Sequence, residues 1–202
     1  MLFQKLKEDG RCRPRNIIGL IGVHPGAGVT YTSVIISFFM GRNLGRKTAL
    51  LECNRRGDFD LLQKTFHWSK EEENFFSYHN IDFYKNANSS LITKVLSYNY
   101  ESYILDFGDN YNENKEEFLR CDLKIIICGH AEWNQQRLIQ FMNKKEIGKQ
   151  NSTWKILIPC ANKKDISRLR KITRQWVDFI PYQEDPTKPS KELIKKLRKI
   201  FV

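Results

Sequence analysis

The chain has 202 residues, of which 41% are apolar, and its 34 lysines and arginines outnumber 23 acidic residues to give a formal net charge of +11. A chain of this size and composition is expected to form one domain with a single large core. No apolar run reaches the ~18 residues of a membrane-spanning helix, and residues 1–15 form a basic tail too polar for a secretory signal. We therefore expect a cytoplasmic protein, neither integral to a membrane nor secreted, whose single domain covers residues 16–202.

Short apolar runs alternate along the chain with stretches that carry apolar residues every three or four positions, as amphipathic helices do. The runs predicted to be strands are residues 16–23, 48–53, 81–84, 103–107, 123–128, 154–159 and 177–180. The stretches predicted to be helices are residues 29–40, 89–98, 132–143 and 165–174. This alternation predicts an α/β fold, a doubly wound, mostly parallel sheet with helices on both faces. Residues 71–73 and 110–117 are expected to be polar connections.

Five cysteines occur without any C-x-x-C pair. Three of them, Cys53, Cys128 and Cys160, stand at the ends of apolar runs. This pattern predicts reduced thiols in the core rather than disulfides or metal ligands.

The most informative segment lies between the first strand and the first helix. A turn of small residues, Pro25 to Gly28, joins them, and its glycines allow backbone N–H groups to face an anion at the positive end of the helix. The usual phosphate-binding pattern is G-x-x-x-x-G-K-[ST], in which the lysine reaches the outer phosphates and the hydroxyl holds magnesium. With Gly28 on the second glycine and Thr30 on the hydroxyl, Val29 takes the lysine position and Val23 that of the first glycine. The sequence predicts a phosphate cradle that lacks its main cation.

The same residues resemble the deviant phosphate loop K-G-G-x-G-K-[ST] of the MinD/ParA family of dimerising ATPases, which includes the CpaE and TadZ pilus-localisation proteins. In this alignment His24 and Val29 replace the two lysines, and Pro25 replaces a glycine. The residues that match are Gly26, Gly28 and Thr30. The resemblance implies a P-loop NTPase-like fold that binds ATP with magnesium. The residues it implies for nucleotide binding are His24, Pro25, Gly26, Ala27, Gly28, Val29, Thr30 and Tyr31.

Weaker matches extend the resemblance along the chain. Residues 48–59 lie where the family has a strand ending in D-x-D-P-x-G, with Glu52 and Asn54 in place of the two acids. Residues 101–109 resemble the strand that ends in the magnesium-side aspartate, here Asp106, and residues 177–186 resemble the late strand that ends in I-P-x-D. The resemblance implies Thr30 and Asp106 as magnesium ligands, although an aspartate at the end of a strand can equally cap the turn that follows it.

The missing lysines predict slow or absent hydrolysis, because phosphoryl transfer depends on positive charge at the transferred phosphate. A triphosphate would meet backbone dipoles and the imidazole of His24, which is mostly uncharged at neutral pH. Arg55 and Arg56 are the nearest residues that could supply a displaced cation. In the alternative interpretation, the glycines only allow a tight turn before a packed helix, and no nucleotide binds.

Residues 162–165 read Asn-Lys-Lys-Asp and match the N-K-x-D string with which GTPases recognise guanine. They directly follow a predicted strand, at the sheet edge where a base would bind. Asn162 and Asp165 are therefore candidate base-binding residues, with GTP as the alternative nucleotide. The simpler interpretation is that Asp165 caps the helix that follows it.

The last residues, about 190–202, predict a basic amphipathic helix. Its apolar face comprises Leu193, Ile194, Leu197, Ile200 and Phe201, and lysines and arginines surround the rest. MinD carries a basic amphipathic helix at this end that binds anionic lipid, so the resemblance implies a peripheral contact with an anionic membrane surface. Alternatively this is the last helix of the fold, with its apolar face packed on the sheet.

The sequence and the resemblance together favour a MinD/ParA-like protein that binds nucleotide weakly and does not hydrolyse it, acting as a scaffold or positioning factor. No catalytic residue is assigned, because Val29 occupies the lysine position. The implied partners are another protein, a second copy of the chain and a membrane surface. The alternatives are a slow ATPase or GTPase that uses a displaced cation, and a basic accessory protein that binds nucleic acid nonspecifically.

Overall fold

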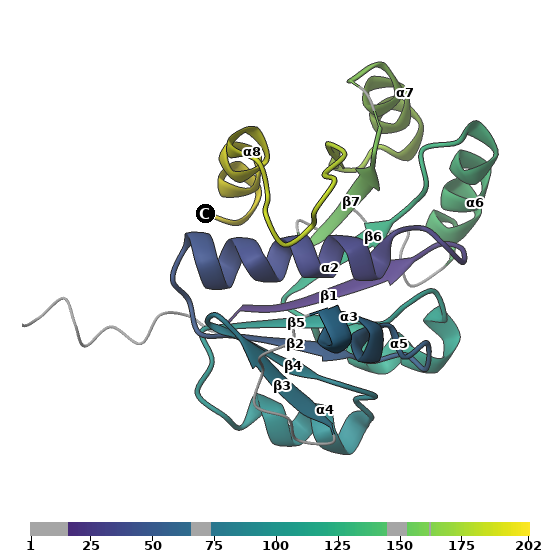
Figure 1. Ribbon diagram of the computed structural model, residues 1–202. Helices are drawn as coiled ribbons and strands as arrows, with labels where there is room; N and C mark the ends of the chain where they lie inside the picture. Colours follow the sequence, from purple (N-terminus) through teal and green to yellow (C-terminus); the bar gives the residue numbers. More distant parts are fainter. Residues whose placement is uncertain (1–15, 66–73, 145–152, 162) are drawn as a thin grey trace, which may run out of the picture.

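The computed structural model describes residues 16–65, 74–144, 153–161 and 163–202, and places an eight-stranded sheet at the centre of the molecule (Figure 1). The strands lie in the order β3-β4-β2-β5-β1-β6-β7-β8, and every neighbouring pair is parallel except β3 with β4. The strands are β1 (Asn16–Gly22), β2 (Thr48–Glu52), β3 (Phe75–Tyr78), β4 (Ile81–Tyr84), β5 (Ser102–Asp106), β6 (Leu123–Ile127), β7 (Trp154–Pro159) and β8 (Val177–Ile180). The predicted basic tail and the polar connection at 71–73 lie outside the described residues.

Helices cover both faces of the sheet, which confirms the predicted fold class (Figure 1). One face carries α2 (Val29–Phe38) with its π-helical continuation η1 (Phe39–Asn43), α3 (Asp58–Thr65) and α8 (Lys191–Phe201). The other carries α4 (Ser89–Leu96), α5 (Tyr111–Arg120), α6 (Glu132–Met142) and α7 (Lys163–Thr173). Because the parallel strands are buried on both faces, they read in the sequence as continuous apolar runs.

β1 lies between β5 and β6, and the carboxyl ends of the parallel strands share one edge, on the right in Figure 1. The loop after β1 therefore lies beside the loops that follow β2 and β5. Open α/β sheets bind their ligands at this edge, in the crevice where the strand order changes direction.

The C-terminal segment forms a helix close to the predicted bounds, and its apolar face packs inward over α2 (Figure 1). Leu193 and Leu197 are fully buried, and the Phe201 ring centroid lies 6.3 Å from that of Phe39. The Ser190 hydroxyl caps the helix by accepting from the Leu193 N–H at 3.3 Å. The apolar face is thus part of the core, and the basic face points outward. None of the described helices is long and apolar enough to cross a bilayer.

One prediction about a connection was wrong, and two elements were not predicted. Residues 110–117, expected to be a polar connection, largely form α5, because Tyr111 and Phe118 are seven residues apart and both are buried on one side of a polar helix. Asn110 caps this helix by accepting from the Glu113 N–H at 3.4 Å. The helix α3 and the antiparallel strand β3 were not predicted at all. In α3 only Phe59 is buried, so its apolar pattern is too sparse to identify.

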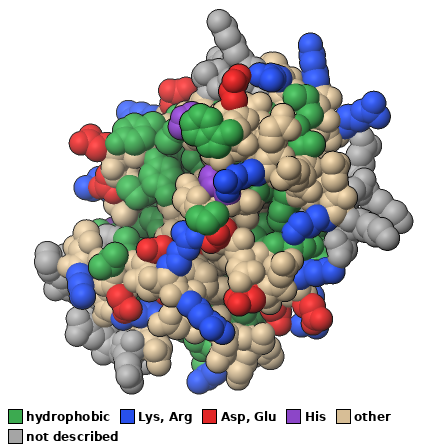
Figure 2. Space-filling view, turned by 90° about the vertical axis from the view of Figure 1, so that its right-hand side faces the viewer, with side chains coloured by type: hydrophobic (Ala, Val, Ile, Leu, Met, Phe, Trp, Pro, Cys, Tyr) green, Lys and Arg blue, Asp and Glu red, His purple; other side chains and the backbone are tan. Residues whose placement is uncertain are grey.

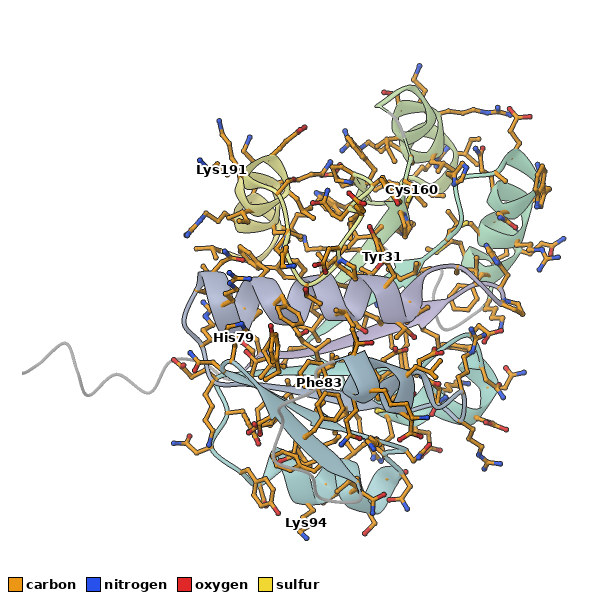
Figure 3. All side chains as sticks on the ribbon, viewed as in Figure 1. Tyr31, His79, Phe83, Lys94, Cys160 and Lys191 are labelled. Carbon is orange, nitrogen blue, oxygen red and sulfur yellow. The ribbon has the colours of Figure 1, made fainter. Side chains whose placement is uncertain are left out.

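The prediction of core thiols holds for Cys53 and Cys128, which are buried and unpaired, but is wrong for Cys160. Cys160 follows the last residue of β7 and adopts a left-handed backbone φ of 60°. This turn exposes its side chain at the carboxyl edge of the sheet, where Figure 3 shows it.

Candidate functional site

The loop between β1 and α2 has a backbone suited to an anion. Gly26 and Gly28 adopt left-handed φ values of 71° and 93°, which strain any residue that has a Cβ atom. Gly28 precedes α2 as its N-cap, no side chain caps the helix there, and the first turn contains no acidic residue. The positive end of the helix is therefore free of a cap from its own side chains. Ala27 closes the turn by donating its N–H to the His24 carbonyl at 3.2 Å.

Val29, at the lysine position of the phosphate-loop pattern, points into the core. Its side chain is 6% exposed and belongs to the apolar cluster beneath α2. A Cβ atom added to Gly22 would lie 2.9 Å from the Val29 Cγ2 atom, so Val29 packs tightly on the end of β1. The predicted nucleotide-binding residue Val29 therefore contributes its backbone to the loop, while its side chain is a packing group.

His24, at the position of the family's signature lysine, is fixed within the fold. Its Nε2 atom accepts from the Gly129 N–H at 3.1 Å, and its Nδ1 atom lies 2.7 Å from the Pro25 carbonyl oxygen. A backbone N–H can only donate, so Nε2 carries no proton and Nδ1 donates to Pro25. Both ring nitrogens are used, and the ring is 8% exposed. This neutral imidazole joins the loop after β1 to the loop after β6 and supplies no positive charge to a ligand.

Thr30 and Asp106, the predicted magnesium ligands, lie in a cluster of oxygen atoms at the carboxyl ends of β1, β2 and β5. The Thr30 hydroxyl donates to the Asp58 Oδ2 atom at 3.2 Å. Ser33, one turn further along α2, donates to the Asp106 Oδ2 atom at 3.4 Å. Sequence analysis identified neither Asp58 nor Ser33. Asp58 is the first residue of α3 and directly follows Gly57. Because α3 was not predicted, the sequence did not indicate that Asp58 lies near Thr30.

Asp106 is fully buried and accepts further hydrogen bonds from the loops around it. Its Oδ1 atom accepts from the Gly108 N–H at 2.9 Å and from the Asn54 Nδ2 atom at 3.2 Å, and its backbone carbonyl accepts from Asn54 at 3.1 Å. Burial raises the pKa of Asp106 to about 6, and the Gly108 N–H and the Thr30 hydroxyl oppose this rise. The bond to Gly108 also fits the alternative role of turn capping, so Asp106 serves the turn in any case.

Glu52 and Asn54, in place of the family's two acids, both have structural roles. Glu52 is fully buried at the end of β2, and its carboxylate accepts from the Phe59 N–H at 3.2 Å and the Asn86 N–H at 3.3 Å. Burial raises the pKa of Glu52, and these backbone bonds oppose the rise. The side chain thus holds the loops after β2 and β4 in place. Asn54 links the loop after β2 to Asp106.

A cavity of about 160 Å³ lies over the glycine loop. Its wall comprises His24, Gly26, Ala27, Gly28, Val29, Thr30, Tyr31, Arg56, Asp58, Gly108 and Asp109. Arg56 and Asp109 form an ion pair across it, joining the loop after β2 to the loop after β5. Arg55 faces a different crevice. Figure 2 looks onto this edge of the molecule and shows acidic and basic side chains interspersed rather than one basic patch.

Tyr31 connects α2 to the segment between β8 and α8 (Figure 3). Its hydroxyl donates to the Gln183 carbonyl at 2.9 Å and accepts from the Gln183 N–H at 2.7 Å. Burial raises the pKa of Tyr31, which keeps the hydroxyl protonated. Gln183 stands where the resembling family has the aspartate of I-P-x-D. The predicted residue Tyr31 is therefore placed at the cavity wall as a support for the loop above it.

The candidate guanine-binding side chains, those of Asn162 and Asp165, are not among the described ones. Asn162 lies outside the described residues. Asp165 is the third residue of α7, which begins at Lys163, and its role as a base contact or as a helix cap stays a prediction.

The oxygen atoms of Thr30, Asp58 and Asp106 fit Mg²⁺, which takes oxygen ligands and is usually completed by substrate phosphates. Within the described ranges, no three His, Cys, Asp or Glu side chains form a ready metal site. A triphosphate alone fits less well. In the described cavity wall and oxygen cluster, the Arg56 guanidinium is the one cation beside the carboxylates of Asp58, Asp106 and Asp109. A phosphate without a metal would be repelled by these carboxylates.

Comparison with known proteins identifies the architecture. No protein-family profile and no curated protein sequence matches this chain. Among solved structures, a plasmid partition protein from Borrelia burgdorferi bound to AMPPNP superposes with a TM-score of 0.65, at 14% identity over 93% of this chain and 97% of that one.

Two further structures show the same likeness. A ParA family ATPase from Chlorobium tepidum has a TM-score of 0.64 at 16% identity, covering 92% of this chain and 94% of that one. The MinD cell division protein of Aquifex aeolicus has a TM-score of 0.64 at 13% identity, covering 92% and 96%. Likeness at this level of identity establishes the fold, and the site must be argued from its own residues. The chain therefore has the fold of the MinD/ParA P-loop ATPases.

Proposed function

We propose that this chain is a CpaE- or TadZ-like scaffold or positioning factor built on the MinD/ParA fold, with a degenerate phosphate loop that binds magnesium nucleotide weakly and does not hydrolyse it. The observation that supports this most directly is the fate of the two lysine positions. Val29 is buried against Gly22, and both ring nitrogens of His24 are used in hydrogen bonds within the protein. No side chain at either position can bring positive charge to a phosphate.

The magnitude of this loss supports inactivity rather than reduced activity. A single cation at the transferred phosphate can contribute several orders of magnitude in rate, about 10³–10⁵-fold for an arginine finger. Here two positions are lost in one loop. The remaining donors are backbone N–H groups, which favour anion binding at a helix N-terminus but do not replace the charge that develops in the transition state.

A phosphate-release assay with ATP and with GTP, each with Mg²⁺, tests this proposal. We expect the purified chain to release phosphate no faster than a protein-free blank. Thr30→Ala and Asp106→Ala should give the same blank rate. A magnesium-dependent rate that disappears in both variants would overturn the proposal.

Nucleotide binding is tested separately by calorimetric titration with ATP and GTP, with and without Mg²⁺. Because carboxylates dominate the site, we expect binding to require Mg²⁺. Structural neighbours of this fold include the Borrelia protein bound to AMPPNP and a MinD from Pyrococcus horikoshii complexed with Mg-ADP, of TM-score 0.62. Equal binding with and without Mg²⁺ would contradict the assignment of Thr30 and Asp106 to the metal.

A positioning role requires a partner, and we propose a second copy of the chain and another protein as the partners. A MinC:MinD complex from Aquifex aeolicus is among the solved structures that resemble this chain, with a TM-score of 0.60. We also propose a cytoplasmic location with peripheral contact at anionic membranes through the basic face of α8. Since the apolar face of α8 is buried, this contact would be electrostatic and sensitive to salt.

The ion pair of Arg56 with Asp109 favours a second candidate, a slow ATPase with a displaced cation. Arg56 lines the loop cavity, and a phosphate that displaced Asp109 would gain the guanidinium. Asp109→Asn should then strengthen Mg-ATP binding, and Arg56→Gln should abolish it. If neither substitution changes binding, Arg56 is a structural partner of Asp109 and this candidate is excluded.

A further inference from the structure

A second crevice, larger than the cavity over the glycine loop, lies at the same edge of the sheet. Its volume is about 480 Å³, within the range of pockets that bind small ligands or side chains. It opens between the loops that follow β2 and β4 on one side and the first turns of α5 on the other. None of the roles discussed above uses it.

The floor of this crevice is apolar and its walls are polar. Cys53, Ala87 and Ile92 form the buried floor. The walls carry four asparagine side chains in addition to charged groups. Primary amides have the same donors and acceptors as a peptide backbone, so such walls are suited to pair with peptide groups. No aromatic side chain is among the described lining residues, which disfavours a ligand bound by ring stacking, such as a base.

The two walls differ in the hydrogen-bonding groups that they present. On the α4 side, the Asn88 Oδ1 atom accepts from the Leu91 N–H at 2.9 Å, which leaves its NH₂ group to donate toward the crevice alongside Ser89. On the α5 side, the Asn114 NH₂ group donates to the carbonyls of Phe107 and Asn110, which leaves its Oδ1 atom to accept. One wall therefore offers donors and the other acceptors, and each edge of an extended peptide, which carries both N–H and C=O groups, can pair with either wall.

The charged side chains of the crevice follow the same division, with an acid on the acceptor wall and a base beside the donor wall. Glu117 already pairs with Arg120 at 3.3 Å. Glu113, on the acceptor wall, and Arg55, beside the donor wall, form no ion pair with the described residues and are exposed. Glu113 is a partner for a cation, and Arg55 is a donor for a carbonyl oxygen or a carboxylate.

We propose that the crevice between α4 and α5 binds an extended peptide segment of a protein partner, with a lysine or arginine side chain of that segment paired to Glu113. Asn114 accepts from the same segment, and Asn86, Asn88, Ser89 and Arg55 donate to its carbonyl oxygens. This inference rests on the proposed scaffold function, since it names the chemistry of the partner. It needs no nucleotide, so its test is independent of the hydrolysis assay.

The test is a nuclear magnetic resonance titration of the intact chain, in which the side-chain NH₂ signals of the asparagines are followed. The probe is Nα-acetyl-lysine amide, which carries an ammonium group and two peptide-like amides. We expect saturable shifts of the NH₂ signals of Asn86, Asn88 and Asn114, with a Kd on the order of 1 mM for a ligand of this size.

Matched probes and variants separate recognition from general charge attraction. Nα-acetyl-norleucine amide, which lacks the ammonium, should bind about three- to fivefold more weakly, because the ion pair with the exposed Glu113 is lost. Glu113→Gln should raise the Kd of the lysine probe to a similar extent. Glu116→Gln, a neighbouring acid on α5 outside the crevice, should leave its Kd within about twofold. All these side chains are exposed, so the variants are expected to fold, and the dispersion of the spectra verifies this.

Three results would overturn the proposal. The first is the absence of any shift of the three asparagine NH₂ signals at saturating probe. The second is equal binding of the lysine and norleucine probes. The third is an equal loss of affinity in Glu113→Gln and Glu116→Gln, which would show attraction to α5 as a whole. Failure of this test would leave the proposal of a non-hydrolysing loop unaffected.

Discussion

Replacing Asp106 by asparagine is expected to stabilise the protein at neutral and alkaline pH. Burial raises the pKa of this carboxyl from an ordinary value of 3.8 to about 6, so the folded state holds its proton more tightly than the unfolded chain does. The folded state then loses stability as the pH rises from about 4 to about 6, and the loss persists above that range. A shift of about two pKa units corresponds to about 3 kcal/mol in the free energy of unfolding.

The geometry allows asparagine to keep the hydrogen bonds that the Oδ1 atom of Asp106 accepts and to replace the bond from Ser33 by one in the opposite direction. Its side-chain oxygen can accept from the Gly108 N–H and from Asn54, as the Oδ1 atom of Asp106 does. Its NH₂ group can donate to the Ser33 hydroxyl, which then turns its own proton fully toward the Thr30 carbonyl, 2.9 Å away. The side chains are nearly equal in volume, so no cavity forms. The substitution therefore removes a charge and little else.

Urea denaturation at pH 4, 6 and 8 measures the effect without added Mg²⁺. Other groups also titrate in this range, so the informative quantity is the difference between the variant and the original chain. We expect a small difference at pH 4 that grows to about 3 kcal/mol in favour of Asp106→Asn at pH 8. Asp109→Asn, in the partly exposed pair with Arg56, should change stability by less than about 1 kcal/mol at every pH. An Asp106→Asn variant that is less stable than the original chain at pH 8 would refute the reasoning.

Three further predictions follow from the same structure. Mg²⁺ should raise the melting temperature of the original chain, measured by circular dichroism, but not that of Asp106→Asn. An equal rise in both proteins would contradict a metal role for Asp106. Truncation before Ser190 removes the buried side chains of Leu193, Leu197 and Ile200 from the core, and each contributes about 1.5–3 kcal/mol to the free energy of unfolding. The truncated chain should therefore lose most of its stability. A truncated chain that melts normally and no longer sediments with anionic vesicles would establish α8 as a membrane anchor. Val29→Lys should lower the melting temperature without strengthening Mg-ATP binding, because the Val29 side chain is buried against Gly22 and an ammonium group there would lie in the core. A folded variant that binds Mg-ATP about tenfold more tightly by calorimetry would show that this position can still bring charge to the loop.

The fold was predictable because its strands are buried on both faces and its connections are regular. Runs such as residues 154–159 and 177–180 were located with the bounds that the structure shows. The helix α5 was missed because ten residues with two buried aromatic rings look like a polar loop until the sheet beneath them is known. The helix α3 was missed for the same reason, and with it the position of Asp58.

The site was predictable in its backbone and less so in its side chains. The phosphate-loop pattern predicted Gly26, Gly28 and Thr30, and the resemblance to the MinD/ParA strand that ends in an aspartate predicted Asp106, since glycine turns and strand ends are local features. The partners of these residues come from distant segments. Asn54 reaches Asp106 across 52 positions of the chain, and His24 reaches Gly129 across 105. Such pairings depend on the order of the strands in the sheet, which periodicity does not encode.

The loop lacks the lysines of the phosphate-binding pattern, whereas the acids Asp58 and Asp106 lie beside it. The residues at the lysine positions and the acids differ in their structural roles. Val29 packs against β1, and His24 bridges two loops, so each residue at a lysine position has a structural function of its own. Burial raises the pKa of Asp106 to about 6, so the charged form of this carboxyl opposes folding above that pH. A buried charge that opposes folding is best explained by a ligand of opposite sign. Together with the oxygens of Thr30 and Asp58, Asp106 presents ligands of the kind that Mg²⁺ takes, and the comparison of Asp106→Asn with the original chain, with and without Mg²⁺, tests the metal role that we propose for it.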